Sequence, residues 1–461
     1  MSFWDSSHLK SLIGTSIIDD CGRFFSFQQF DKTIQEAANF LSQKGSRMVG
    51  FIVMRNSYDC VVAYLSCLRS GHVPLLLSES ISSDLIESLI QAYQPDWIIS
   101  ENFDGACFSG TSLNISFRKS IRPSKVSVHQ DLALLLSTSG STGSPKLVRL
   151  SYSALQGNAE SIVDYLDIRQ EDRALTVLPC HYSFGLSVIN SHILAGASIH
   201  VRDVSVLSAD FLSCIRDYSV TSISGVPATY QMLIRSGFGK KDLPSLNKLT
   251  QAGGRLSARM AEHILGIAEK YNWKFFVMYG QTEATARISY VPPNLLASKI
   301  DSIGVPIPGG CLQIDPVNSE LIYKGKNVML GYAQSYLDLS KGDELCGILR
   351  TGDVGKTDND GFFYITGRLK RFVKLAGNRV NLDEVEAFVE NTLGCVSMVV
   401  GQDDKMQVHI KCESLHDLKI IEDRIIQTFN IHYSMFSVSQ IAELPLLSSG
   451  KKDYHSLNSE S

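Results

Sequence analysis

Residues suited to binding a polyphosphate are concentrated in one short segment, LLSTSGSTGSPKLVR at residues 135–149. An apolar run stops there at ten residues drawn from Ser, Thr, Gly, Pro and Lys. The glycines adopt left-handed backbone angles at no steric cost, and the hydroxyls and free N–H groups supply many donors. We predict that a strand runs into a phosphate-binding loop, because N–H groups and a cation then converge on anionic oxygens. The members of this loop, called the cradle below, are Ser137, Thr138, Ser139, Gly140, Ser141, Thr142, Gly143 and Lys146.

The alternative for this segment is a flexible Ser/Gly linker. A Pro-Lys pair between two apolar runs argues against a linker. The segment is not a common P-loop, because Gly140 is followed after two residues by Gly143 and Lys146 comes later. The chain has no G-x-G-x-x-G dinucleotide fingerprint either. The cradle therefore indicates ATP binding by another kind of fold.

Two acidic side chains lie at places where a nucleotide could be held. Thr282 and Glu283 follow an aromatic run and Gly280. A hydroxyl beside a carboxylate could bind a phosphate oxygen and a divalent cation, and an ordinary helix N-terminus is an equal alternative. Asp353, in LRTGDVG, is expected in a tight turn between strands. It is either a turn aspartate or a ligand of ribose hydroxyls.

The remaining candidates are basic. Arg368 and Lys370 open the run GRLKRFVK, which is either a solvated linker or a hinge that brings cations to a phosphate. Lys451, in LSSGKKDY, is either part of a tail or a functional lysine. His181 follows a predicted strand end in CHYSFGL, and a structural histidine is the default for a lone imidazole.

Composition limits the classes of protein. The chain has 461 residues and a formal net charge of −4, which argues against a dedicated nucleic-acid binder. Its ten cysteines are scattered without a C-x-x-C pair, which favours reduced thiols in a cytosol over disulfides or a zinc site. The N-terminus lacks a signal-peptide pattern, and no apolar run is long enough to span a membrane. We expect a location in the cytoplasm.

The elements that must position these side chains alternate between strand and helix. This alternation predicts an α/β fold, with a large N-terminal domain of mixed, mostly parallel sheets. Asn158, within a predicted helix, is expected to face solvent. Gly253 and Gly254 lie at a predicted strand end, where doubly wound sheets bind ligands. The predicted helices cover residues 28–45, 61–71, 84–93 and 151–165, and the predicted strands cover 48–53, 72–77, 97–100, 174–178, 198–201, 222–226, 248–252 and 275–279.

From about residue 304 the pattern changes to short strands separated by Gly and Asp turns, which predicts a small β subdomain at about 304–368. From residue 370, two helical segments and three apolar runs predict a compact α+β domain. We therefore expect an N-terminal domain at 1–368 and a C-terminal domain at 370–461.

The order of six motifs resembles one family. STSGSTGSPK, HYSFG, YGQTEAT, RTGD, GRLKRFVKLAGNRV and SSGKK occur in that order. They are similar to the motifs of the adenylate-forming enzymes, which include acyl- and aryl-CoA ligases, peptide-synthetase adenylation domains and luciferases. The resemblance extends from about residue 25 to residue 451.

The resemblance implies an activity in two steps. A carboxylate attacks the α-phosphate of Mg-ATP and gives acyl-AMP and pyrophosphate, and a thiol of CoA or phosphopantetheine then displaces AMP. ATP and Mg²⁺ are the implied cofactors. A mobile C-terminal domain would swing between the two half-reactions.

The resemblance also assigns a role to each motif. The cradle would bind the β- and γ-phosphates, Thr282 would touch the α-phosphate and Glu283 would hold magnesium. Asp353 would bind the ribose hydroxyls, and Arg368 would reach ribose or phosphate. The residues implied around the adenine and its strand are Gly253, Gly254, Arg255, Tyr279, Gly280 and Gln281.

The C-terminal motifs contain the residues that the resemblance implies for the domain movement and the two half-reactions. Lys451 would bridge the acyl carboxylate and the α-phosphate, although GKKDY departs from the commoner GK with a following Arg. Lys370 matches the family's hinge position, and Gly377 lies in the segment implied to face the incoming thiol.

The motifs define the carboxylic acid substrate less closely than the nucleotide. Amino-acid-activating members usually have Phe-Asp where this chain has Phe184 and Gly185, so an α-amino acid is disfavoured. HYSFG is more similar to the acyl- and aryl-ligase version, in which His181 would lie near the carboxylate or gate the pocket. The pocket walls are expected from Val226, Pro227, Ala252 and the segment after Glu283. Two alternatives remain: an enzyme that loads a carrier protein or feeds amide synthesis, and an inactive nucleotide-binding scaffold or regulatory subunit.

Overall fold

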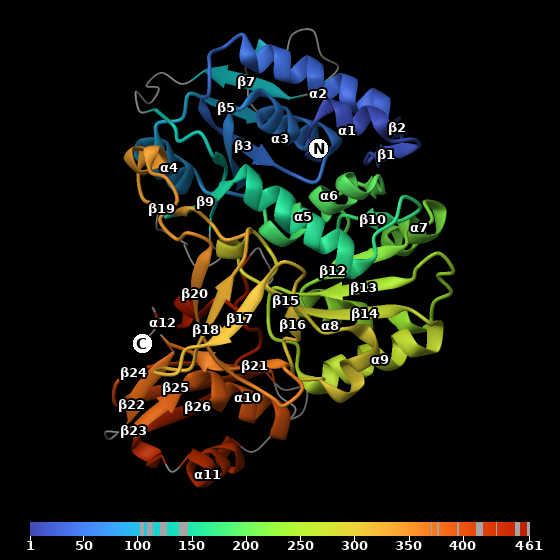
Figure 1. Cartoon of the computed structure of the whole chain (residues 1–461). Helices are drawn as coiled ribbons and strands as arrows, with labels where there is room; N and C mark the ends of the chain where they lie inside the picture. Colours follow the sequence, from blue (N-terminus) through green and yellow to red (C-terminus); the bar gives the residue numbers. More distant parts are fainter. Residues whose placement is uncertain are drawn as a thin grey trace.

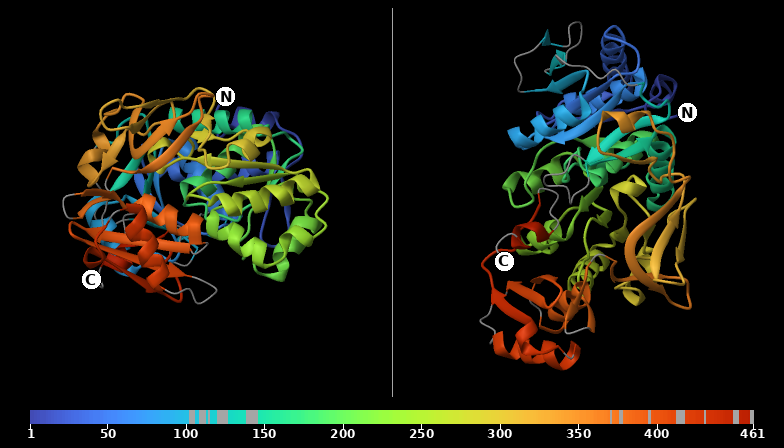
Figure 2. Two further views of the ribbon diagram at one scale, coloured as in Figure 1. Left: turned by 90° about the horizontal axis from the view of Figure 1, so that it is seen from below. Right: turned by 90° about the vertical axis from the view of Figure 1, so that its left-hand side faces the viewer.

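The computed structural model describes residues 1–101, 106–107, 113, 115–119, 127–137, 146–369, 371–375, 378–393, 396–411, 418–429, 431–447 and 452–458. Two large sheets make up most of the N-terminal part, and a smaller α+β unit lies at the end of the molecule opposite the first of these sheets (Figures 1 and 2). This arrangement confirms the predicted α/β class with mixed sheets and a C-terminal α+β domain. The exact domain boundaries remain a prediction.

The first large sheet has eight strands in the order β19-β9-β8-β4-β3-β5-β7-β6. The contacts of β4 with β3 and β8, and of β3 with β5, are parallel, and these strands are almost wholly buried. The bounds are β3 (Val49–Met54), β4 (Val73–Ser78), β5 (Trp97–Ser100), β6 (Ala106–Cys107), β7 (Ser116–Lys119), β8 (Leu132–Ser137), β9 (Leu147–Ser151) and β19 (Gly331–Ala333).

The second large sheet has nine strands in the order β16-β15-β14-β13-β12-β10-β11-β1-β2. Its centre is parallel from β11 to β14, so the carboxyl ends of these strands meet at one edge. The bounds are β1 (Thr15–Ile18), β2 (Phe24–Ser26), β10 (Arg173–Leu175), β11 (Ser198–His200), β12 (Ser222–Gly225), β13 (Lys248–Gln251), β14 (Lys274–Tyr279), β15 (Ser289–Tyr290) and β16 (Val305–Pro306).

Helices fill the space between the two sheets and cover their outer faces (Figure 1). The largest hydrophobic core joins both sheets through α2, α3, α5 and α6. The inner helices, with α1 at their edge, are α1 (Ser6–Ser11), α2 (Phe27–Ser42), α3 (Tyr58–Ser70), α5 (Tyr152–Leu166) and α6 (Ser183–Ala195). The outer helices are α4 (Ser83–Tyr93) on the first sheet and α7 (Ala209–Asp217), α8 (Pro227–Arg235) and α9 (Ala258–Tyr271) on the second.

The ends of these helices follow local sequence signals. Ser26 accepts a hydrogen bond from the backbone of Gln29, whose side chain accepts one in return, and this capping box starts α2. Gly71 ends α3 with φ at +77°, a conformation that glycine adopts without a steric penalty.

One expectation about α5 is wrong. Asn158 was expected to face solvent, but it is 1% exposed. The helix lies between two sheets, so its polar position is covered as well as its apolar stripe.

A separate antiparallel sheet has four strands in the order β17-β18-β20-β21. Its strands are β17 (Cys311–Ile314), β18 (Glu320–Lys324), β20 (Ile348–Thr357) and β21 (Phe363–Arg368). The intervening strand β19 leaves this sheet and pairs with β9 in the first large sheet. The segment between β18 and β20 therefore links the four-stranded sheet to β9, the strand that follows the cradle.

The C-terminal unit consists of a hairpin, β22 (Phe372–Leu375) with β23 (Asn378–Asn381), and a three-stranded sheet in the order β24-β25-β26. Its core contains Val385 and Val389 from α10 and Ile421 and Ile425 from α11. The remaining bounds are α10 (Leu382–Leu393), β24 (Val396–Gln402), β25 (Lys405–Lys411), α11 (Leu418–Phe429), β26 (Phe436–Gln440) and α12 (Tyr454–Asn458).

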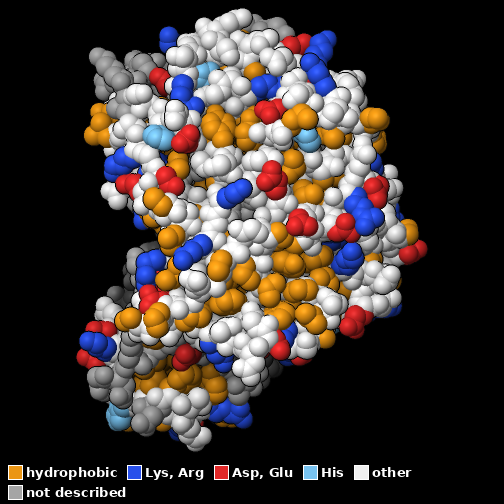
Figure 3. Space-filling view, in the orientation of Figure 1, with side chains coloured by type: hydrophobic (Ala, Val, Ile, Leu, Met, Phe, Trp, Pro, Cys, Tyr) orange, Lys and Arg blue, Asp and Glu red, His pale blue; other side chains and the backbone are white. Residues whose placement is uncertain are grey.

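The surface shown in Figure 3 is indented on the left, between the upper part of the molecule and the C-terminal unit. Basic and acidic side chains are interspersed over this face. Within the described residues, no helix combines the length and the apolar character needed to cross a bilayer.

Candidate active site

The two ends of the predicted cradle segment belong to paired strands. Ser137 at the end of β8 pairs with Leu147 at the start of β9, so the chain reverses between them. Ser137 is exposed, and the ammonium of Lys146 lies 3.4 Å from the centre of the Tyr332 ring. The other six predicted members, Thr138, Ser139, Gly140, Ser141, Thr142 and Gly143, lie outside the described residues.

Tyr332 connects Lys146 to Glu283. Its hydroxyl donates a hydrogen bond of 2.8 Å to Glu283 Oε1, while its ring contacts the lysine ammonium. Burial and then the Glu283 carboxylate raise the pKa of this tyrosine. The structure thus brings together a predicted cation and a predicted magnesium ligand from segments almost 140 positions apart. We did not identify Tyr332 from the sequence, because β19 offers only a short Gly-Tyr-Ala run.

Thr282 and Glu283 lie in a single 3-10 turn, Thr282–Ala284, directly after β14. Thr282 is 7% exposed, and its hydroxyl lies 3.2 Å from that of Ser183 at the start of α6. The YGQTE and HYSFG motifs are therefore in contact. Nearby, burial lowers the pKa of His181 to about 4, so its imidazole is neutral at pH 7.

The glycines of the predicted adenine wall are required by close contacts. Gly253 has φ at +81°, and a Cβ atom there would lie 2.8 Å from the Tyr182 hydroxyl. A Cβ on Gly280 would lie only 1.9 Å from the carbonyl oxygen of Ala286. Gln281 donates a long hydrogen bond of 3.5 Å to the carbonyl of Thr351, which joins this loop to β20.

Asp353 is not in a turn, contrary to the sequence-based expectation. It lies within β20 and faces Arg368 of β21, and the preceding Gly352 takes a left-handed conformation inside the strand. Its carboxylate accepts hydrogen bonds from the Tyr279 hydroxyl and, at 3.2 Å, from Arg368 Nε. The residue is 8% exposed, and burial raises its pKa despite these two partners.

A cavity of about 1460 Å³ joins the N-terminal part to the C-terminal unit. Its volume exceeds the range of about 300–1,000 Å³ common for ligand pockets. The predicted site residues that line it are Gly253, Gly254, Arg255, Tyr279, Gly280, Asp353 and Arg368. Among the described residues, Thr282, Glu283 and His181 lie outside this lining, although Gln281 and Thr351 connect the turn to the cavity wall.

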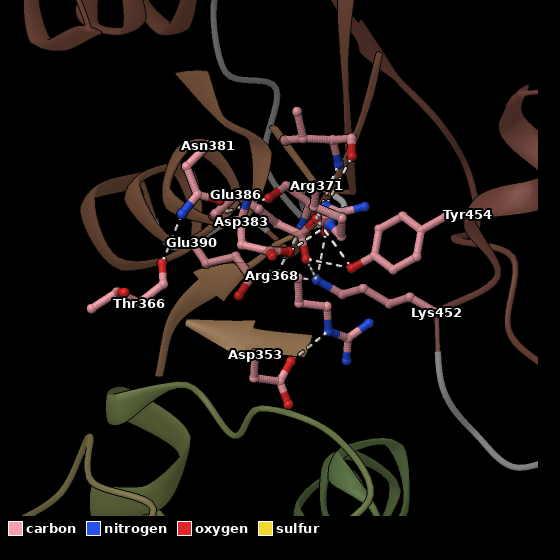
Figure 4. Close-up of polar contacts among 12 residues, drawn as sticks. Asp353, Thr366, Arg368, Arg371, Asn381, Asp383, Glu386, Glu390, Lys452 and Tyr454 are labelled. Carbon is pink, nitrogen blue, oxygen red and sulfur yellow. Dashed lines mark hydrogen bonds and ion pairs between the residues drawn. The ribbon is translucent and has the colours of Figure 1, made fainter. Parts of the chain in front are cut away.

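The C-terminal side of the cavity contains a network of charged side chains (Figure 4). Lys452 donates a hydrogen bond of 2.7 Å to Glu390 and contacts Glu386, and both carboxylates lie on α10. Tyr454 donates to Glu386, and its ring lies 3.9 Å from the guanidinium of Arg371. Burial alone would lower the pKa of Lys452, but the two glutamates raise it above its ordinary value.

Three further predicted residues, Lys370, Gly377 and Lys451, lie outside the described part of the chain. Arg368 ends β21 on the cavity, and Lys452 is held against α10.

Comparisons with known proteins agree with this fold. The family model described as "AMP-binding enzyme" matches residues 14–333. The 2-succinylbenzoate–CoA ligase of Staphylococcus epidermidis is 26% identical over 343 residues, which cover 72% of this chain and 70% of that protein. The corresponding Staphylococcus aureus ligase is 27% identical over 331 residues, covering 70% and 65%. The chain thus aligns with about two thirds of the length of these relatives.

Solved structures give the same fold at lower identity. The o-succinylbenzoate CoA synthetase of Bacillus subtilis, solved with its acyl-adenylate intermediate, has a TM-score of 0.80 and 20% identity over 99% of this chain and 98% of that one. ATP-bound MatB from Rhodopseudomonas palustris has a TM-score of 0.82 and 20% identity over 100% and 99%.

Proposed function

Because this chain belongs to the AMP-binding enzyme family, we propose that it activates a carboxylic acid with Mg-ATP and transfers the acyl group to a thiol. In the first step a carboxylate oxygen attacks the α-phosphorus, and the bond to pyrophosphate breaks. In the second step the thiol, after losing its proton, attacks the acyl carbon, and AMP leaves. The observation that carries this proposal is the junction of Lys146, Tyr332 and Glu283, together with the hydrogen bond from Gln281 to Thr351 that joins the Glu283 turn to the strand of Asp353.

The residues fit a nucleotide and a magnesium ion. Asp353 is a buried carboxylate at the cavity wall, suited to two ribose hydroxyls, and burial raises its pKa. Glu283 offers the oxygen ligand that magnesium prefers, and Tyr332 fixes its orientation. Magnesium, when bound, would neutralise charge on the phosphates and stabilise the leaving pyrophosphate.

The other residues act by position and charge. Lys146 and the cradle direct a cation and N–H groups at the phosphate tail, where negative charge grows during transfer. Thr282 holds a hydroxyl against Ser183, at the junction of the turn with α6. The neutral imidazole of His181 lies at the same end of the sheet and can approach a carboxylate without a charge of its own.

An α-amino acid is an unsuitable substrate for steric as well as electrostatic reasons. A Cβ atom on Gly185 would lie 2.2 Å from the carbonyl oxygen of Pro179. No aspartate fits at this position without movement of the backbone, so an ammonium group would lack its partner. We therefore propose an acyl or aryl acid as the substrate.

The acceptor is CoA or the phosphopantetheine arm of a carrier protein. The curated relatives are named as CoA ligases, which favours CoA. Loading of a carrier protein remains the alternative, as does feeding an amide-forming enzyme. The scattered cysteine pattern leads us to expect the reaction in the cytoplasm.

The test is acid-dependent exchange between ATP and labelled pyrophosphate, with a panel of fatty, aryl, hydroxy and dicarboxylic acids. We expect exchange that requires both magnesium and one acid class. Nucleotide binding without exchange for any acid would favour the inactive scaffold instead. CoA and a carrier protein are then compared as acceptors with the best acid.

A further inference from the structure

Arg287 is a buried cation in the segment that follows the Thr282–Ala284 turn. The side chain is 2% exposed, and its guanidinium carbon lies 3.9 Å from the centre of the Phe184 ring on α6. Phe184 belongs to a hydrophobic cluster with Val226 and Ala252, two residues predicted to form the acid pocket. The guanidinium therefore lies among the predicted pocket walls.

This guanidinium lacks a counter-ion. Within the described residues, no carboxylate oxygen lies within 4 Å of it. Its Nε has no hydrogen-bond partner, and Nη1 only reaches the carbonyl of the adjacent Ala286 at 3.4 Å. The hydroxyls of Tyr165 and Tyr182 are its other polar neighbours. Burial lowers the pKa of Arg287, and the tyrosines around it offset this only in part.

Two other arginines with little exposure, Arg69 and Arg149, show how this protein stabilises a structural guanidinium. Arg69 lies 2.7 Å from Asp31, and Arg149 contacts Glu344 and four backbone carbonyls. Both form ion pairs with acidic side chains of the chain itself. A buried charge without such a partner destabilises the folded state. Arg287 therefore lowers the stability of the ligand-free protein.

Arg287 also lies directly behind the cavity wall. Its Cα would be 2.9 Å from a Cβ on Gly280, which lines the cavity. Met278, another lining residue, accepts a hydrogen bond of 3.0 Å from Tyr165, the tyrosine beside the guanidinium. Gly280 and Met278 therefore connect the cavity wall to the surroundings of Arg287.

We propose that Arg287 binds a second carboxylate of the acid substrate, so that this enzyme activates a dicarboxylic acid. The inference rests on the proposed function and names its substrate class. One carboxylate reacts with ATP near Thr282, and the other pairs with the guanidinium between Phe184 and Tyr165. Arginine suits this task because its planar fork matches a carboxylate in two parallel hydrogen bonds.

The first test compares matched acids in the pyrophosphate exchange assay. Glutarate is paired with pentanoate, and 2-succinylbenzoate with 4-oxo-4-phenylbutanoate, so each pair differs by one carboxylate. We expect the dicarboxylic member to be preferred by the unmodified enzyme. Arg287→Gln should lower kcat/KM for the dicarboxylic acid by about 30-fold or more, since it removes one partner of a buried charge pair. The monocarboxylic acid should change by less than about threefold.

The second test does not depend on activity. Because Arg287 is uncompensated without ligand, Arg287→Met should leave the Tm of the ligand-free protein unchanged or raise it. The dicarboxylic acid should raise the Tm of the unmodified protein but not that of Arg287→Met. Arg173→Gln is the matched control, because Arg173 is also partly buried but donates to Ser198 and to the carbonyl of Tyr218. That variant should lose stability and keep the acid preference.

The outcomes separate this inference from the proposed function. Exchange with monocarboxylic acids alone, unaffected by Arg287→Gln, would leave acid activation intact and overturn the role of Arg287. A large fall in Tm for ligand-free Arg287→Met would also overturn it, since the arginine would then be structural. If no acid supports exchange, the proposed function is contradicted. In that case a rise in Tm with the dicarboxylic acid that requires Arg287 would support the anion site, and the absence of such a rise would overturn it.

Discussion

At the scale of single residues, Tyr332 links the two charged groups on which the proposed chemistry depends. It holds Glu283 by a hydrogen bond of 2.8 Å and contacts Lys146 through its ring. A carboxylate that is held before the metal arrives loses less conformational freedom when it becomes a ligand. Tyr332 is therefore a positioning residue for magnesium.

Tyr332→Phe removes only the hydroxyl and should raise the magnesium concentration needed for half-maximal activity. Loss of a hydrogen bond to a charged group is worth about 1.5–3 kcal/mol, or about 10- to 100-fold. Activity is measured at saturating ATP over a magnesium titration. Tyr364→Phe is the control, because its hydroxyl also donates to a carboxylate, Asp358, on a different sheet edge. An unchanged magnesium requirement would contradict the role of Tyr332 in positioning Glu283.

Buried histidines predict how stability depends on pH. Burial lowers the pKa of His181, His192 and His200 to about 4, below the value of about 6.5 in an unfolded chain. Between these two values the unfolded chain binds more protons, so the free energy of unfolding falls as the pH falls from about 6.5 to about 4. The slope is about 1.4 kcal/mol per pH unit for each such group.

Urea unfolding at about pH 7 and about pH 5 measures this effect. His192→Gln should reduce the pH dependence of the free energy of unfolding by the contribution of one histidine. His263→Gln, at an exposed position on α9, should leave it unchanged. Equal stability at both pH values would contradict the buried, neutral state of these imidazoles.

At the scale of elements, the sequence predicted well where local signals decide. The periodic helix predicted at 28–45 corresponds to α2, and the helix predicted at 61–71 corresponds to α3, which ends at Gly71. Asp353 and Asn158 were misplaced because long-range contacts decide there. Pairing with two neighbouring strands keeps Gly352 and Asp353 inside β20, and two sheets enclose α5. The sequence alone also could not show that Tyr332 contacts Glu283, or that Arg287 has no acidic partner among the residues that the structure describes.

The segment that carries the proposed catalytic lysine is attached to α10 by its neighbour. Lys452 is 24% exposed in its side chain and is held by Glu386, Glu390 and the carbonyl of Ser397. The sequence GKKDY contains two adjacent lysines, and this network assigns Lys452 to anchoring. Lys451 then remains the candidate for the reaction.

Lys452→Met should lower the free energy of unfolding of the C-terminal unit by about 2–4 kcal/mol, since it removes the cation from Glu390 and leaves Arg371 as the cation that pairs with Glu386. The urea midpoint of the chain measures the loss, with Lys405→Met at an exposed position of β25 as the control. Combining Lys452→Met with Glu386→Gln should recover part of the stability. Equal midpoints for the two single lysine variants would contradict the anchor.

At the scale of the whole molecule, the cavity between the N-terminal part and the C-terminal unit is the place where the two half-reactions would share one nucleotide. Asp353 and Arg368 contribute from the four-stranded sheet, and Glu386 and Lys452 from the C-terminal unit. A domain that brings a lysine to this cavity in one step and withdraws it in the next would carry two active sites on one scaffold.

Lys451→Ala should therefore separate the two steps. We expect loss of acyl-AMP formation from acid and ATP, with thiolysis of supplied acyl-AMP largely retained. Each half-reaction is measured by itself, with purified acyl-AMP for the second. An equal loss in both steps would contradict a lysine that acts only in adenylation.

The account as a whole depends on a carboxylate oxygen becoming bonded to the α-phosphorus of ATP. The measurement that tests this most directly uses the preferred acid labelled with oxygen-18 in its carboxylate, followed by mass spectrometry of the nucleotide product after complete turnover with a thiol. The account predicts AMP that carries one labelled oxygen, together with unlabelled pyrophosphate. Formation of ADP, or of AMP without label, would contradict it.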